Sequence, residues 1–249
     1  MNIVKIQFSD GRPDVTGLED VNNVLNTVGV RASTIPVPAE ARPLLKAYQS
    51  RAITEGEEHQ LISIFNLTRP ELMEQIRLAG RVPVVDGGGE FTTEGGQSSY
   101  PKVYDMKAMS EDVQKFVLNK YGRLHVNTSD TGMGIDEVMT VIAGGPFTWM
   151  YLLPDGVLAR LTVAFVGEHD EAVRLSYPGI RMHAGYMDAK EGLVVAFAHG
   201  PDNFEIRYEA DIAHSHLLGD NPWWTLAVTC HPCTKNWHNG KQSWPCGQL

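Results

Sequence analysis

The first 121 residues carry hydrophobic positions mainly at the spacing of α-helices. Over residues 16–29 the apolar side chains recur three and four positions apart, which predicts a helix with one buried face. Thr16 and Glu19 have the spacing of a capping box, and Gly29 can adopt the left-handed conformation that ends a helix. Further helices are predicted over residues 43–52 and after Thr54, Thr68 and Ser110. We therefore expect a helical N-terminal region over residues 1–121, with one short extended segment at 30–36.

From Leu124 onward the pattern changes to short apolar runs separated by turn residues. Strands are predicted over residues 137–143, 147–153, 157–166, 172–177, 184–187, 193–198 and 204–208. Gly-Gly, Asp-Gly and Pro-Gly pairs mark three of the turns between them. Regular short strands of this kind are typical of an antiparallel β-barrel or jelly roll. The sequence thus predicts a mainly β protein: a barrel over residues 122–218, on which the helical region packs, and a tail over 219–249.

A glycine-rich stretch over residues 81–101 separates two of the predicted helices and has no periodicity. Its Gly87-Gly88-Gly89 run lacks the Gly-Lys-Ser/Thr ending of a phosphate-binding loop. The stretch is therefore interpreted as a flexible connection or as a flap over an active site.

The net charge of the chain limits the kinds of partner that it can bind. The 249 residues include 30 Asp and Glu against 21 Lys and Arg, a formal net charge of −9. Nucleic acids and anionic membranes require a dense cationic surface, so neither is an expected partner. The apolar runs are far shorter than the roughly 20 residues of a membrane-spanning helix. The N-terminus also lacks the apolar segment of a signal peptide, so a cytoplasmic protein is expected.

Two segments of the β-region carry candidate chemistry. The first contains His125 and, after an insertion, Glu137 at the start of an apolar strand that ends in Gly-Gly. The second is a Pro-Gly turn followed by His183. This arrangement resembles the two motifs of the cupin superfamily, in which inward side chains of adjacent strands converge. Imidazoles and a carboxylate that meet in this way form a site for a divalent transition metal.

The order of several segments is similar to that of the acireductone dioxygenase family in particular. Residues 20–37 and 44–49 resemble its N-terminal helix, its Gly-Val-Arg turn and its Ala-Tyr-Gln helix. Residues 200–208 and 211–213 resemble its C-terminal tail. The resemblance implies a cupin-like barrel that holds Fe(II) or another divalent transition metal and oxidises a small organic substrate with O₂.

Carried over residue by residue, the resemblance makes His125, Glu137 and His183 the metal ligands, with Glu137 and His183 also catalytic. The second His of the family's His-x-His pair falls on Asn127, and the family's Arg after Glu-Val falls on Met139. His199 is a possible replacement ligand. Arg181, which could bind an anionic group, and the aromatic residues Tyr186 and Trp149 are the candidates for substrate binding, although surface and core roles remain open for them.

The three cysteines all lie in the last twenty residues. Cys230, Cys233, His238 and Cys246 have the residue types of a closed structural zinc site. Three thiols without a metal, or a redox pair at Cys230 and Cys233, are the alternatives. An acidic chain with few cations in the tail argues against RNA binding by such a site.

Three functions are consistent with these patterns. The leading one is a metal-dependent oxygenase of the cupin type acting on a small molecule. The others are a non-catalytic cupin that binds a ligand, which the Asn127 departure favours, and a metal-dependent isomerase or lyase on the same barrel. The strand edges expected of a cupin also make a homodimer plausible.

Overall fold

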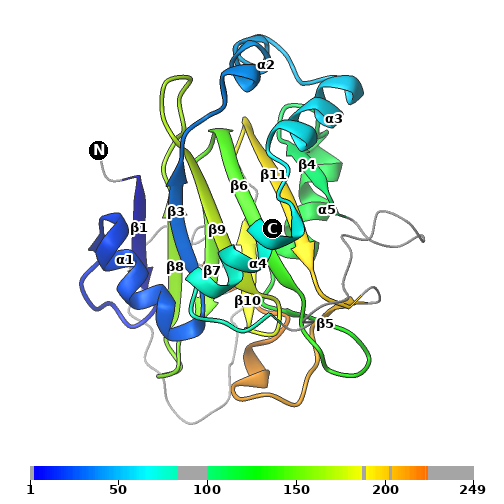
Figure 1. Ribbon diagram of the computed structural model, residues 1–249. Coiled ribbons are helices and arrows are strands. Elements are labelled where there is room, and N and C mark those ends of the chain that lie inside the picture. Colours follow the sequence, from blue (N-terminus) through cyan, green and yellow to red (C-terminus); the bar gives the residue numbers. More distant parts are fainter. Residues whose placement is uncertain (1–2, 84–99, 187–188, 202–203, 222, 224–249) are drawn as a thin grey trace, which may run out of the picture.

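The protein is described from a computed structural model over residues 3–83, 100–186, 189–201, 204–221 and 223 (Figure 1). The predicted flap at Gly87-Gly88-Gly89 lies outside the described residues. So does the predicted zinc site of Cys230, Cys233, His238 and Cys246. Within the described residues, no helix has the length and apolar character needed to cross a membrane.

Two five-stranded antiparallel sheets form the centre of the molecule. The first has the order β10 (His183–Tyr186), β7 (Phe147–Leu152), β8 (Leu158–Val163), β1 (Val4–Phe8) and β2 (Val15–Thr16). The second has the order β3 (Arg31–Ile35), β9 (Ala172–Pro178), β6 (Asp136–Gly144), β11 (Gly192–His199) and β4 (Lys102–Asp105). A two-stranded sheet joins β12 (Glu205–Arg207) to β5 (Val126–Thr128).

The main hydrophobic core lies between the two large sheets. Ile6, Trp149 and Leu161 of the first sheet belong to the same buried cluster as Met139 and Leu175 of the second. Because side chains alternate between the two faces of a strand, every second residue of β6, β9 and β11 faces this core. The same alternation decides which polar residues of these strands reach the interior.

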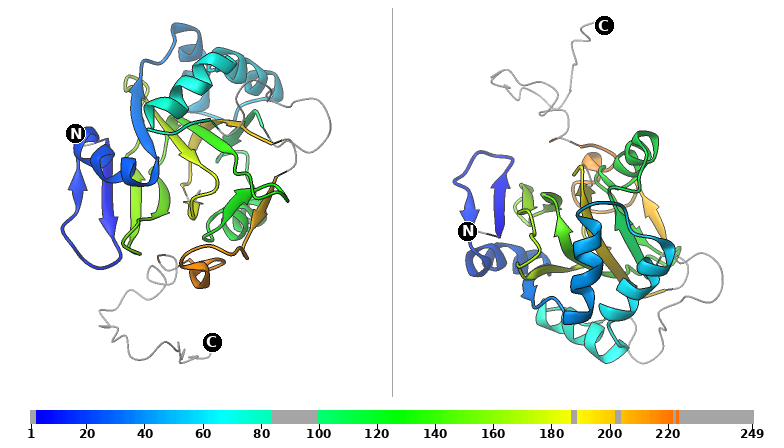
Figure 2. Two further views of the ribbon diagram at one scale, coloured as in Figure 1. Left: turned by 60° about the horizontal axis from the view of Figure 1, so that its bottom comes forward. Right: turned by 90° about the horizontal axis from the view of Figure 1, so that it is seen from above.

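Helices cover the outer face of the second sheet (Figures 1 and 2). Apolar residues of α2 (Arg42–Tyr48), α3 (Glu55–Ile64) and α4 (Arg69–Leu78) form a second cluster with the outward residues of β6 and β11. A third cluster, on the other side of the molecule, joins α5 (Glu111–Tyr121) to the outward residues of β7 and β10. The second cluster therefore buries the outer face of the second sheet, and the third cluster buries part of the outer face of the first sheet.

The N-terminal region contains more strands than predicted, which corrects its description as a helical extension with one extended segment. Strand β1 pairs with β8, β3 with β9, and β4 with β11, so residues 1–121 are built into both sheets. The alternation of Val4, Ile6 and Phe8, all buried, with Lys5 and Gln7 is the period-two pattern of a strand. The extended segment predicted over residues 30–36 corresponds to β3.

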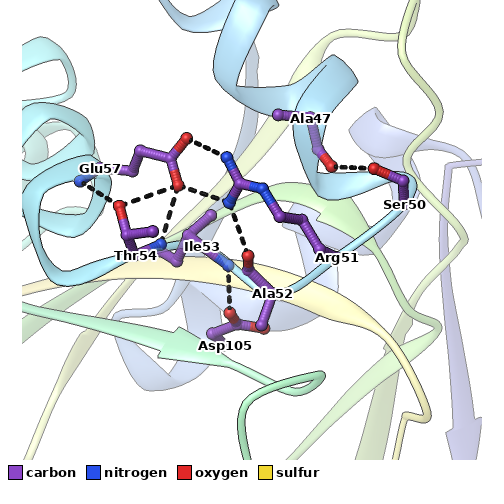
Figure 3. A network of polar contacts seen from close by, with 8 residues as sticks. All are labelled: Ala47, Ser50, Arg51, Ala52, Ile53, Thr54, Glu57 and Asp105. Carbon is purple, nitrogen blue, oxygen red and sulfur yellow. Dashed lines mark hydrogen bonds and ion pairs between the residues drawn. The ribbon is translucent and has the colours of Figure 1, made fainter.

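Three of the four predicted helix caps are present. Thr54 and Glu57 form a capping box, as do Thr68 and Glu71, and the Ser110 hydroxyl accepts from the backbone of Val113. Figure 3 shows the Thr54 box, in which the Arg51 guanidinium also donates to the Glu57 carboxylate. The Thr16 cap is wrong. Thr16 belongs to β2 and pairs with Lys5, so Gly17 precedes helix α1 (Leu18–Leu25) instead.

All seven strands predicted after Leu124 are present, with ends that differ by a few residues. The closed barrel is not: the strand ladders of the described residues make separate sheets. Isolated bridges connect them at two points, His125 with His183 and Gly144 with Val166. The first of these bridges brings two of the predicted metal ligands together.

Candidate functional site

His125 and His183 are adjacent on neighbouring strands. Each donates its backbone N–H to the carbonyl of the other, at 2.9 and 3.0 Å, and their ring centroids lie 4.5 Å apart. Both side chains are buried. Residues directly opposite in an antiparallel pair project to the same side, so the Pro-Gly turn and the Leu124 segment place both imidazoles at one point.

Both rings are oriented by backbone carbonyls. Nδ1 of His125 lies 2.6 Å from the Arg123 carbonyl oxygen, and Nδ1 of His183 lies 2.7 Å from that of Arg181. A carbonyl only accepts, so each Nδ1 carries a hydrogen and Nε2 is the remaining nitrogen. Burial, with the neighbouring His183, lowers the pKa of His125 to about 3. His125 is therefore neutral at pH 7, with a lone pair on Nε2.

Glu137 lies on the inward face of β6, and each of its carboxylate oxygens accepts a hydrogen bond. Tyr100 donates its hydroxyl hydrogen to Oε1 at 2.7 Å, and Asn127 donates from Nδ2 to Oε2 at 2.8 Å. Burial raises the pKa of Glu137, but the contact with His183 and these two hydrogen bonds outweigh it, so the pKa lies below its usual value. The buried group is thus a carboxylate at neutral pH.

His183 and Glu137 meet directly at the cavity. Nε2 of His183 lies 3.3 Å from Oε2 of Glu137, and both residues are buried. Two lone pairs at this distance in a low-dielectric site repel each other. The Asn127 amide nitrogen, 2.8 Å from Oε2 and 3.4 Å from Nε2, lies against both atoms, and a cation bound to both would remove the repulsion.

These groups surround a small cavity of about 20 Å³. Such a volume holds one water-sized species. The lining consists of Tyr100, Tyr104, Tyr121, His125, Asn127, Glu137, Met139, Trp149, Tyr177, His183 and Gly185. None of these described lining residues is Lys or Arg, so the polar side-chain groups of the wall are hydroxyls, imidazoles, one indole N–H, one amide and one carboxylate.

The three residues predicted to bind substrate lie in three different places. Trp149 lines the cavity. Tyr186 faces the opposite side of β10 and packs in the outer cluster with Met150 and Ala184. The Arg181 side chain is exposed, and only its backbone carbonyl reaches the site. The structure thus brings Trp149 to the metal-ligand candidates and leaves Tyr186 and Arg181 outside.

His199 does not join the other candidate ligands. In the ladder between β11 and β6 it pairs with Asp136, while Ala198 pairs with Glu137. Because paired residues share a face, His199 lies on the side of Asp136, opposite to Glu137. The residue is 2% exposed, and within the described part of the chain neither ring nitrogen has a hydrogen-bond partner.

Four tyrosines of the cavity wall were not recognised in the sequence: Tyr100, Tyr104, Tyr121 and Tyr177. Tyr177 had a usable signal, because it continues the alternation of apolar residues Val173 and Leu175 along its strand; in the structure it pairs with Glu137. Tyr100 had none, since it follows the glycine-rich stretch and reaches Glu137 only through the fold.

The donor set suits a divalent transition metal. Two imidazoles anchored through Nδ1 and one carboxylate are the residue types of a two-histidine, one-carboxylate site. Asn127 is 4% exposed, and its Oδ1 has no hydrogen-bond partner among the described residues. As they stand, the described residues contain no group of three His, Cys, Asp or Glu already spaced around an ion. A cation would therefore replace the direct contact between His183 and Glu137.

Comparisons with known proteins bear on the fold. No protein-family model and no curated protein matches the chain. Among solved structures, an acireductone dioxygenase from Bacillus anthracis, described with a cadmium ion in its active centre, matches with a TM-score of 0.55. The match covers 84% of this chain and 99% of that chain at 13% sequence identity. The chain therefore shares the fold of an acireductone dioxygenase, in agreement with the cupin-like fold that the sequence resemblance implied.

Proposed function

We propose that this protein is an oxygenase that uses a divalent transition metal, Fe(II) in the first instance, to oxidise a small organic molecule with O₂. His125, Glu137 and His183 would hold the ion. The observation that carries the proposal is the convergence of two carbonyl-anchored imidazoles and one buried carboxylate on a single cavity. The shared fold of a dioxygenase supports it.

The ion, when bound, would supply a Lewis-acidic, redox-active centre at which substrate and O₂ can react. The protein supplies the arrangement. The carbonyls of Arg123 and Arg181 fix the two rings, and Tyr100 keeps the Glu137 carboxylate in place. Glu137, whose second carboxylate oxygen need not bind the ion, is the group that can accept a proton beside the substrate.

The aromatic wall completes the site by excluding water. Trp149 and Tyr177 are buried and close the side of the cavity that faces the core. A dry environment strengthens the interactions of the few charged groups inside.

Elemental analysis of protein purified without oxygen tests the proposal. We expect about one transition metal per chain at the cavity, which His183→Ala removes together with substrate-dependent O₂ uptake. His169→Ala is the matched control, because His169 is exposed in the turn before β9. Zinc that persists in His183→Ala but disappears in Cys233→Ser would belong to the predicted tail site. No metal in the unsubstituted protein, and none taken up on reconstitution, would overturn the proposal.

A ligand-binding protein without a metal is the second candidate. The position of the Asn127 amide, which donates to Glu137 where the family has an imidazole, favours it. This candidate predicts that reconstitution with Fe(II), Mn(II) or Zn(II) leaves the thermal stability unchanged. Metal binding without O₂ uptake would instead favour an isomerase or lyase on the same site.

A further inference from the structure

The three polar atoms at the centre of the cavity form a small triangle. Nδ2 of Asn127 lies 2.8 Å from Oε2 of Glu137 and 3.4 Å from Nε2 of His183, and these two atoms lie 3.3 Å apart. Metal–ligand distances of about 2.1 Å place neighbouring ligand atoms roughly 3.0–3.4 Å apart. The triangle therefore already has the spacing of three ligands on one face of a coordination polyhedron.

One vertex of the triangle is of the wrong kind for a ligand. An amide nitrogen has no lone pair available for a cation, whereas the amide oxygen has two. In the metal-free protein the nitrogen must face Glu137, because Oδ1 in its place would lie against a carboxylate. Oδ1 is consequently left buried and, within the described residues, without a hydrogen-bond partner. Such an unsatisfied acceptor is costly.

Rotation of the amide resolves both features. The two ends of the Asn127 side chain have nearly the same shape, so a half-turn about Cβ–Cγ exchanges Oδ1 and Nδ2 with little steric change. We propose that Asn127 is the third ligand on this face of the metal site. Its Nδ2 donates to Glu137 in the metal-free protein, and its Oδ1 coordinates the cation in the metal-bound protein.

This inference rests on the proposed metal site. With an amide oxygen in place of a third imidazole, the site has a harder ligand set, in the sense of hard and soft metal ligands. A carbonyl oxygen suits Mn²⁺ and related ions better than it suits soft cations, and imidazole has the opposite preference. The departure at Asn127 would then alter the metal selectivity of the site rather than abolish metal binding.

Mn²⁺ binding to the metal-stripped full chain tests the inference, because the EPR signal of free Mn²⁺ reports binding and thiolates of the tail compete poorly for this ion. We expect Asn127→Ala to weaken Mn²⁺ binding by about tenfold or more. Asn127→Asp should lower the melting temperature of the metal-free protein, since a second carboxylate then faces Glu137. Mn²⁺ should raise its melting temperature more than that of the unsubstituted protein. Asn66→Asp, at an exposed position, controls for the added charge.

Three results would contradict the inference or the metal site on which it rests. Unchanged or tighter Mn²⁺ binding by Asn127→Ala would show that the amide only occupies the place of the cation, and it would overturn this inference alone. Absence of binding in the unsubstituted protein, for Mn²⁺ and for Fe²⁺, would overturn the proposed metal site itself. If Asn127→Ala fails to fold, a normal metal-free melting temperature of Asn127→Asp would equally overturn the role of Nδ2 as the donor to Glu137.

Discussion

The hydroxyl of Tyr100 donates a hydrogen bond of 2.7 Å to Oε1 of Glu137, and both residues are buried. Burial, together with the Glu137 charge, raises the pKa of Tyr100 well above its usual value. The hydroxyl therefore remains a donor at any physiological pH. Tyr100 thus links the segment before β4 to the carboxylate at the centre of the site.

Replacement of Tyr100 by Phe should lower the free energy of unfolding by about 1.5–3 kcal/mol, the usual range for a hydrogen bond to a charged group. The reason is that one oxygen of a buried carboxylate loses its donor. Urea denaturation measures the change. Tyr151→Phe is the matched control: the Tyr151 hydroxyl is buried with no partner among the described residues, so its removal should be neutral or stabilising. Equal losses in the two variants would contradict the interpretation.

The Asn22 side chain forms hydrogen bonds to the backbone of the edge strand of the second sheet. Its side-chain amide donates to the Ala32 carbonyl at 2.9 Å and accepts from the Ala32 N–H at 2.8 Å, on edge strand β3. Asn22→Ala leaves both buried backbone groups unsatisfied, and we expect a loss of about 2 kcal/mol or more in denaturant unfolding. The exposed neighbour Asn23 provides the control, because Asn23→Ala should leave stability unchanged or slightly raised.

The capping box of α3 should make stability depend on pH in the acid range. The Arg51 hydrogen bond and the Thr54 backbone bond lower the pKa of Glu57 to about 2. A carboxylate with a depressed pKa stabilises the folded state above its unfolded value near 4.5 and loses this effect as the pH falls through 2. Glu57→Gln should therefore be less stable than the unsubstituted protein at pH 7, with a difference that shrinks towards pH 2.

Thermal unfolding between pH 7 and pH 2 measures this difference. Glu55→Gln removes the same charge from the same helical turn but not the capping bond, and it should show a smaller and less pH-dependent effect. A Glu57→Gln difference that stays constant over the whole range would contradict the assignment.

His199→Leu distinguishes the two faces of β11. The imidazole is buried, and its nitrogens have no partner in the described part of the chain, so an apolar side chain of similar size should leave stability unchanged or raise it. Metal content should also stay as in the unsubstituted protein, because His199 faces away from Glu137. Loss of one metal per chain in this variant, measured against His183→Ala, would contradict the placement of the two histidines.

Sequence patterns identified some residues of the candidate site correctly and misplaced others. His125, Glu137 and His183 were identified because motifs place each of them beside a turn or a strand start, and the fold does bring them to one cavity. Tyr186 and His199 were placed there too, and both face the other side of their strands. Strand faces alternate with every residue, so a candidate one position away from the inward register lies on the opposite face of the sheet.

By itself the sequence determined the local features of this protein. Thr54, Thr68 and Ser110 cap helices because a cap depends on residues three positions away, and the strands after Leu124 follow from their own apolar runs. Only the tertiary structure decided which distant groups meet. Tyr100, 37 residues from Glu137, and Asn127, ten residues from it, reach its two oxygens only through the fold. Hydrogen bonds of this kind depend on sheet order and register, which no local pattern of residues specifies.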